Sequence, residues 1–279
     1  MVMIPPKPEQ QLVTRIYEGY VSREAKPEVY LGRLGSSFIG EECIRHIWLD
    51  WRGFAREQFE GRMLRLFETG HQQEARIVED LRNAGLEVWD VQEDGAQYEF
   101  VDETGHFITK MDGVVKGVPE SEKTAHALEV KTHNKNSFSA VAKKGAQEAK
   151  PLHYAQVQIT MSLAGLTRTL YVSLCKDDEQ FYIERVKEDK PEQARLHKKI
   201  ITLVEARMRP AGISTDGSSF GCKYCGMKAV CTKEAAPLRH CRTCINAAPV
   251  ENGEWKCEFH NWLLDKPAQL AACADYEAL

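Results

Sequence analysis

Long apolar runs are missing from this 279-residue sequence. No stretch approaches the roughly 18 apolar residues that a membrane-spanning helix needs. The first residues, MVMIPPKPEQQLVTRIYEG, also lack the apolar centre of a signal peptide. We therefore expect a cytoplasmic protein that does not contact a membrane.

Several other features are absent. The net charge of -4 excludes a wholly basic nucleic-acid coat protein, although a local basic surface can lie beside an acidic metal site. The sequence has no internal repeat and no composition typical of disorder. It also has no glycine motif for a flavin or a dinucleotide, which argues against an electron-transfer protein. What remains is an ordinary globular chain, long enough for one core of about 200 residues and a small appended part.

The hydrophobic periodicity predicts a mixed α/β protein. Apolar residues at helical spacing indicate helix within 37–67, and a further helix over 68–84 that ends before Gly85. A period of two then predicts strands, and the remaining helices and strands alternate. The expected strands are 86–92, 97–102, 107–118, 126–132, 167–176 and 180–187, and the later helices are 136–149, 151–165 and 191–208. This order predicts a mixed sheet flanked by helices.

The composition changes after Met208. The stretch RPAGISTDGSSFG is rich in glycine, serine and proline, which is typical of a linker. We expect a core with an N-terminal helical part over residues 1–210, a cysteine-rich segment over 211–235 and a separate zinc-knuckle module over 236–279.

The strand HALEVKT carries the strongest candidate for chemistry. Glu129 and Lys131 are two residues apart, so their side chains should lie on one face of the strand. The same tripeptide pattern recurs elsewhere by chance, but here the neighbours are alanine, leucine and valine. A glutamate and a lysine on such a strand are costly unless they are paired or bound to an ion.

Further acids are expected near this pair. Asp112 lies about one hairpin upstream, and two carboxylates beside a lysine can hold Mg²⁺ or Mn²⁺ against a phosphate. The alternative is that Asp112 only forms an Asp-Gly turn. Glu74, on the helix before the sheet, is a candidate third ligand, and His71 is a competing candidate. The alternative is that both are ordinary solvated residues of the helix. Gln156, on the helix after the sheet strand, either contacts a phosphate or is simply exposed.

This series of residues resembles the PD-(D/E)XK nuclease superfamily. The matching positions are Glu74 in G-x3-E, Asp112-Gly113, Glu129-Val130-Lys131 and Gln156, in a helix-strand-strand-helix order. Within the superfamily the chain is similar to the RecB-like branch with iron-sulfur nucleases, which includes the CRISPR-adaptation exonucleases and AddB-type nuclease domains. The resemblance covers residues 33–232.

The resemblance implies roles for these residues. Asp112 and Glu129 would bind the catalytic metal with Glu74, Lys131 would position the attacking water, and Gln156 would contact DNA or the site. Two positions depart from the branch. Glu74 stands where RecB-like members usually have histidine and is closer to the lambda-exonuclease-like pattern, and Thr160 stands where a tyrosine is expected.

Most of the nine cysteines fall between Cys222 and Cys273. The iron-sulfur branch has one cysteine before the nuclease motifs and three after them, spaced C-x2-C-x5-C. The resemblance thus implies a 4Fe-4S cluster, or zinc at the same place. Its ligands would be Cys43, Cys222, Cys225 and Cys231.

The spacing C-x2-C-x12-C-x2-H predicts a structural zinc at Cys241, Cys244, Cys257 and His260. A different partition gives one zinc to Cys222, Cys225, Cys241 and Cys244. Cys175 is expected to be a buried thiol, and Cys273 has no assignment.

A basic run at the knuckle offers either a DNA-backbone contact with stacking tryptophans or an ordinary solvated surface. It comprises Lys223, Lys228, Lys233, Arg239, His240 and Arg242, with Trp255 and Trp262 nearby.

The expected function is a metal-dependent DNA exonuclease, with endonuclease activity left open, in recombination, repair or phage DNA metabolism. The alternative is a non-catalytic DNA-binding or assembly subunit with the same fold. Beyond DNA, a second copy of the chain or a recombination or replication protein is a candidate partner.

Overall fold

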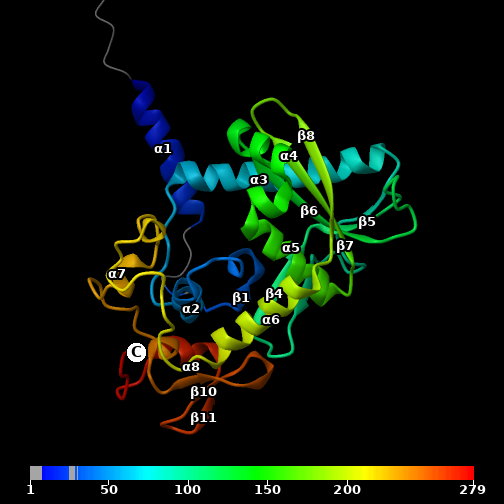
Figure 1. Cartoon of the computed structure of the whole chain (residues 1–279). Coiled ribbons are helices and arrows are strands. Elements are labelled where there is room, and N and C mark those ends of the chain that lie inside the picture. The colour runs from blue at the N-terminus through cyan, green and yellow to red at the C-terminus, as the bar shows by residue number, and fades with distance from the viewer. Residues whose placement is uncertain (1–7, 25–28, 30) are drawn as a thin grey trace, which may run out of the picture.

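The fold is known from a computed structural model, which describes residues 8–24, 29 and 31–279. It is the expected mixed α/β fold, with helices on both sides of a mixed sheet (Figure 1). Among the described residues, no helix is long and apolar enough to cross a membrane.

The central sheet has the strand order β2-β5-β6-β7-β8. Only β6 and β7 pair in parallel, and the other neighbours are antiparallel. A parallel pair needs a crossover connection, which here is formed by two helices, α4 (Lys135–Ala149) and α5 (Pro151–Ala164). The strands are β2 (Glu87–Trp89), β5 (Gly113–Lys116), β6 (His126–His133), β7 (Arg168–Cys175) and β8 (Phe181–Lys187).

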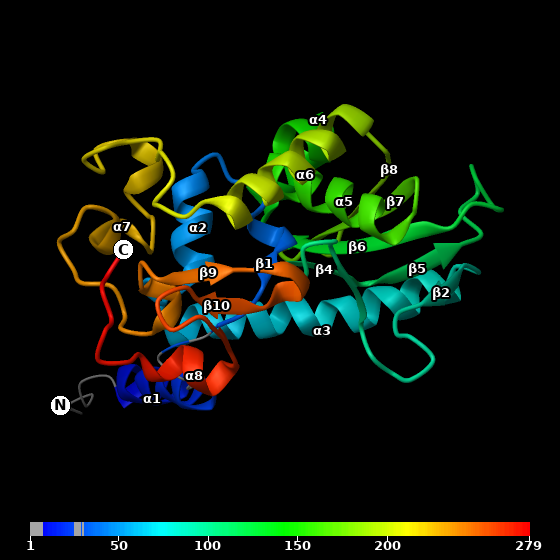
Figure 2. The same cartoon turned by 90° about the horizontal axis from the view of Figure 1, so that it is seen from below.

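Helices cover both faces of this sheet. Alternation along β6 directs Leu128 and Val130 to one face, where they pack with Ile77 and Leu81 of α3 (Gly61–Asn83). On the other face, Tyr171 of β7 packs with residues of α4 and α5. Figure 2 shows α3 below β5 and β6, and α4, α5 and α6 (Lys190–Glu205) above them. Glu129 and Lys131 therefore belong to the side covered by α4 and α5.

A smaller sheet contains β1 (Leu34–Gly35), β4 (Phe107–Met111) and β3 (Tyr98–Val101). The single strand expected over 107–118 is thus wrong, because the chain leaves one sheet after Met111 and enters the other at Gly113. A Cβ atom at Gly113 would lie 2.7 Å from the Trp89 carbonyl oxygen, so a glycine is needed where the chain changes sheets. The apolar alternation continues through this point and hides the break.

The N-terminal helices also differ from their expected bounds. Helix α2 spans only Ile44–Arg52 and ends at Gly53, which has a left-handed backbone conformation. Helix α3 begins at Gly61, seven residues before the expected start, and ends as expected just before Gly85. Helix α1 (Pro8–Arg23) packs across α3.

The C-terminal part forms a three-stranded antiparallel sheet, β11-β10-β9. Its elements are β9 (Ala247–Pro249), β10 (Trp255–Cys257), β11 (Trp262–Leu264) and α8 (Lys266–Ala271), preceded by α7 (Lys228–Cys231). The short 3-10 helices are η1 (Ser36–Phe38), η2 (Phe220–Cys222), η3 (Cys241–Thr243) and η4 (Glu251–Gly253).

This C-terminal part is not separate from the core. Trp255 shares one buried hydrophobic cluster with Trp48 and Trp51 of α2 and with Leu196 of α6. Figure 2 shows β9 and β10 beside α2, and the fully buried Arg52 donates hydrogen bonds to Arg242 O and Ala247 O. Residues 236–279 thus share buried contacts with the core, and their folding as a separate module stays a prediction.

Candidate active site and metal centres

The candidate active site lies where β6 extends beyond its neighbour β5. The pairing of the two strands begins at Gly113 opposite Leu128, so β6 continues past it without a partner in β5. There the backbone N–H of Val130 donates a hydrogen bond to Asp112 Oδ2, at 2.8 Å. The Asp112 carboxylate thus takes the place of a backbone acceptor and is held next to Glu129.

Glu129 and Lys131 form an ion pair on one face of β6. Lys131 Nζ lies 2.5 Å from Glu129 Oε1. The Glu129 side chain is only 3% exposed, whereas Lys131 keeps 27% of its side chain accessible. The expectation that strand alternation places these two side chains together agrees with this geometry.

The acids of this group crowd one another. Burial raises the pKa of Glu129 to about 7, and the negative charges of Asp112 and Glu74 add to the rise while Lys131 opposes it. Burial also raises the pKa of Asp112, and burial together with Asp112 raises that of Glu74. Burial alone would lower the pKa of Lys131, but the three surrounding acids raise it above its ordinary value, so the lysine stays charged. The structure therefore brings Glu74, Asp112, Glu129 and Lys131 together.

A cleft of about 290 Å³ opens beside these residues. Its lining includes Gly70 and Glu74 of α3, Lys131 of β6, and Lys150 and His153. His71 lies near enough to Glu74 and Asp112 to lower the pKa of both, so it accompanies Glu74 at this end of α3.

Two histidines near the cleft were not expected from the sequence. His133 and His153 stack with their ring centroids 5.6 Å apart, and both contact the Tyr171 hydroxyl, His153 Nδ1 at 2.8 Å. Burial, with Lys150 and Lys131 close by, lowers the pKa of His133 to about 4 and that of His153 to about 3. Both imidazoles are thus neutral at pH 7. Alternation from Lys131 would have placed His133 on the same face, but only tertiary packing reveals His153.

Gln156 is not among the residues that line the cleft. It is half-buried on α5, where its carbonyl oxygen accepts a hydrogen bond from Thr160 Oγ1. Thr160, in place of the expected tyrosine, is buried and hydrogen-bonded to Thr109 Oγ1 at 2.6 Å. Thr160 thus joins α5 to β4. The role of Gln156 stays a prediction.

Cys43 meets three cysteines from a distant part of the sequence at a second place. Cys43, Cys222, Cys225 and Cys231 all line one cavity, with Met227 and Leu49 among its other walls. Arg45 Nη1 donates to Cys231 Sγ at 3.6 Å. Among the described residues, no three of these sulfur atoms lie within 4.8 Å of one another. The four cysteines of the first set therefore surround one cavity, and their sulfur atoms do not converge on a single point.

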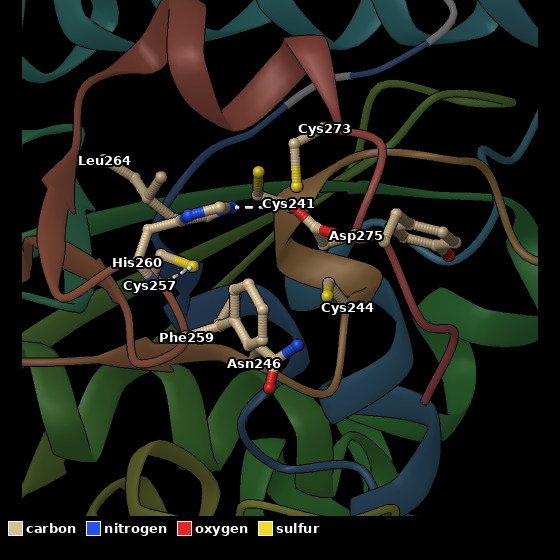
Figure 3. A pocket seen from close by; sticks show the side chains of 11 residues that line it. Cys241, Cys244, Asn246, Cys257, Phe259, His260, Leu264, Cys273 and Asp275 are labelled. Carbon is tan, nitrogen blue, oxygen red and sulfur yellow. Dashed lines mark hydrogen bonds and ion pairs between the residues drawn. The ribbon is translucent and has the colours of Figure 1, made fainter.

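The second cysteine set lines a different cavity. Cys241, Cys244, Cys257 and His260 surround it, together with Cys273 and Asp275 (Figure 3). The alternative partition, with Cys222 and Cys225 joining Cys241 and Cys244, would require ligands from two separate cavities.

Two residues of the expected basic run and one of its two tryptophans are internal. His240 and Trp255 are fully buried and Arg242 is 5% exposed. His240 Nε2 contacts the Gly53 carbonyl oxygen at 2.8 Å, and Arg242 Nη1 donates to Gly32 O. Trp262 is exposed as expected. The buried members connect the C-terminal part to the core, which excludes them from contact with a DNA backbone.

The chain matches no known family in a comparison with protein-family models. It also has no match among curated protein sequences. Solved structures do match. An alkaline exonuclease from Laribacter hongkongensis is 17% identical, with a TM-score of 0.46 over 67% of this chain and 90% of that one.

Two other solved structures are similar to a comparable degree. The protein SSO0001 is 14% identical, with a TM-score of 0.46 over 81% of this chain and 98% of that one. A phage-related exonuclease from Haemophilus somnus 129PT is 12% identical, with a TM-score of 0.44 over 62% of this chain and 92% of that one. The function proposed below rests on the side chains of this chain.

Proposed function

We propose that this chain is a metal-dependent nuclease of the PD-(D/E)XK type that hydrolyses DNA phosphodiester bonds. The observation that carries the proposal is the convergence of Glu74, Asp112 and Glu129 on Lys131 beside an open cleft. Three carboxylates and one ammonium group leave an excess of negative charge, which a divalent cation would neutralise.

The residues present fit Mg²⁺ or Mn²⁺. Both are hard cations that prefer carboxylate oxygens, and Asp112, Glu129 and Glu74 offer them from three different elements. Burial raises the pKa values of Asp112 and Glu129, and the charges of Asp112 and Glu74 add to the rise at Glu129, a cost that a bound cation would offset. When bound, the metal would polarise the phosphate and lower the pKa of a coordinated water.

The positive charge of Lys131 limits the part it can play in hydrolysis. In the metal-free site the surrounding acids keep Lys131 protonated, which makes it a hydrogen-bond donor and not a base. It can donate hydrogen bonds to the attacking water or to a phosphate oxygen, and so position the nucleophile and stabilise negative charge as it develops. Lys150 and the neutral His153, which also line the cleft, are placed to contact the phosphates of a bound strand.

The first cysteine set has the four thiolates that a 4Fe-4S cluster or a single zinc ion would need. Four thiolates on one tetrahedral zinc, with Zn–S bonds near 2.3 Å, would bring the sulfur atoms to about 3.8 Å from one another. The thiolates of a 4Fe-4S cluster are farther apart, because each binds a different iron. Cys43, Cys222, Cys225 and Cys231 line one cavity, and the motif order of the resemblance favours a cluster there.

The resemblance in motif order favours an exonuclease in recombination, repair or phage DNA metabolism. The test is a cleavage assay with Mg²⁺ or Mn²⁺ on end-labelled linear DNA beside covalently closed circles, single- and double-stranded, with Lys131→Ala as control. Loss of linear substrate alone would support an exonuclease, and cut circles would support an endonuclease. DNA binding without cleavage would instead support the non-catalytic subunit.

A further inference from the structure

Cys273, which no sequence motif explains, lies at the second cysteine cavity. Among the described residues, one group of potential metal-binding side chains converges within 4.8 Å, and it consists of His260, Cys273 and Asp275. Cys273 lines one cavity with Cys241, Cys244 and Cys257, so all four thiols border the same space. The predicted zinc set thus has one cysteine more than the motif contains.

The chain on both sides of Cys273 is held in place. Upstream, the buried Gln269 donates to Leu264 O and accepts from Arg242 Nε, both within 2.8 Å. Downstream, Ile245 donates to Glu277 O and a β-bridge joins Cys244 to Ala278. Arg239 Nη2 also donates to the Cys273 carbonyl oxygen at 3.0 Å. Cys273 is therefore positioned over the Cys241–Cys244 turn by contacts that do not involve a metal.

The His260 ring lies against three other side chains at this cavity. Its Nε2 atom lies 3.3 Å from Asp275 Oδ2. Its ring stacks on Trp262, with centroids 4.8 Å apart, and meets the edge of Phe259. Figure 3 shows the imidazole directed at Asp275, with the Cys241 and Cys273 sulfur atoms beside this line. The ring is already oriented by an aromatic stack and a carboxylate, whereas Cys273 lies beside the imidazole, the Asp275 carboxylate and the thiols of the cavity.

We propose that Cys273 completes a four-thiolate zinc site with Cys241, Cys244 and Cys257, and that His260 and Asp275 form a polar pair outside the ligand set. Soft thiolates favour Zn²⁺, and a structural site is closed by four protein ligands. The ligands come from the η3 turn, from β10 and from the tail after α8. One ion would therefore fix the end of the chain onto the β9-β10-β11 sheet.

The first test uses the full-length protein with Co²⁺ in place of zinc, because cobalt bound by thiolates absorbs in proportion to their number. Spectra of zinc-loaded samples are subtracted to remove absorption from an iron-sulfur cluster. Cys273→Ala should lose about a quarter of the thiolate-to-cobalt intensity, one ligand of four. His260→Ala should keep that intensity, and Cys175→Ala, a buried thiol outside both cavities, is the matched control. Unchanged intensity in Cys273→Ala would overturn the proposal.

The second test needs no substitution, so it does not depend on the folding of a variant. The native protein is treated with iodoacetamide with zinc present and after a zinc chelator, and each cysteine is followed by peptide mass spectrometry. Cys273 is exposed, so as a free thiol it should be alkylated readily. We expect zinc to protect it together with Cys241, and the chelator to release both. Equal alkylation of Cys273 in the two samples would refute its role as a ligand.

Discussion

Asp112 accepts the backbone N–H of Val130 at 2.8 Å, and this bond joins the end of β4 to the middle of β6. The carboxylate sits between two sheets that separate at this point, beside the buried Glu129. At this point of β6 the Val130 N–H is bound by a side chain and not by a neighbouring strand. This side of β6 therefore has room for a substrate. The divergence of β4 and β5 therefore shapes the candidate site and fixes the Asp112 carboxylate in it.

Replacing Lys131 separates catalysis from binding. Lys131→Ala should reduce DNA cleavage by about 100-fold or more, because it removes a charged donor aimed at the reacting phosphate. DNA binding should persist, since Lys150 and the cleft walls remain. Single-turnover cleavage and binding at equilibrium measure the two effects. The matched control is Lys144→Ala on α4, whose ion pair with Glu148 is exposed. Normal cleavage by Lys131→Ala would refute the site.

Metal binding should depend on pH through Glu129. Its pKa is raised from 4.5 to about 7, so the metal-free folded protein holds a proton that the unfolded chain releases. This group therefore lowers metal-free stability as the pH rises from 4.5 to 7, and a bound cation must displace the proton. The rise in Tm caused by Mn²⁺ should be larger at pH 8 than at pH 6, with apparent affinity changing up to about tenfold per pH unit below the pKa.

Asp112→Asn is the control for this titration. The amide keeps an oxygen for the Val130 N–H but is a poor cation ligand. We expect Mn²⁺ to leave the Tm of this variant almost unchanged at both pH values. A Mn²⁺ effect equal to that of the unchanged protein would place the metal elsewhere.

Gly113→Ala tests the point where the chain changes sheets. A Cβ atom there would lie 2.7 Å from Trp89 O, so the strands must shift, at a cost of about 1–3 kcal/mol. The shift should also displace Asp112 and slow cleavage. Urea unfolding measures the first effect and the cleavage assay the second. Gly19→Ala, in the exposed middle of α1 with open space around it, should be neutral or stabilising.

Patterns among neighbouring residues were enough to predict the part of the site that lies on a single strand. Strand alternation was enough to place Glu129 and Lys131 on one face, and helix periodicity was enough to end α3 before Gly85. The break at Asp112 could not be predicted, because it depends on the approach of Trp89, more than twenty residues away. The stacking of His133 on His153 was also hidden, since it requires the crossover that brings α5 over β6.

Cys43 should be needed for both iron and stability. A cluster bound by Cys43 and by residues 222–231 joins two ends of the core and closes a very long loop. Cys43→Ser should therefore lower the iron content and the Tm together. Cys175→Ser, in a buried strand away from both cavities, should change neither the iron content nor the brown colour. Unchanged iron in Cys43→Ser would remove Cys43 from the ligand set.

Arg52 should be needed for the C-terminal part and the core to unfold together. The fully buried guanidinium donates to Arg242 O and Ala247 O and lies 5.0 Å from the centre of the Trp255 ring. Arg52→Met leaves these carbonyl oxygens without their donor, which should cost about 2–5 kcal/mol.

The measurement for Arg52→Met is urea unfolding followed by tryptophan fluorescence. The exposed Arg195→Met on α6 should leave the midpoint unchanged. Because Trp48, Trp51 and Trp255 share one cluster, we expect a single transition at a lower urea concentration. Two separate transitions in the unchanged protein, with only one of them sensitive to Arg52, would show that residues 236–279 fold as an independent module.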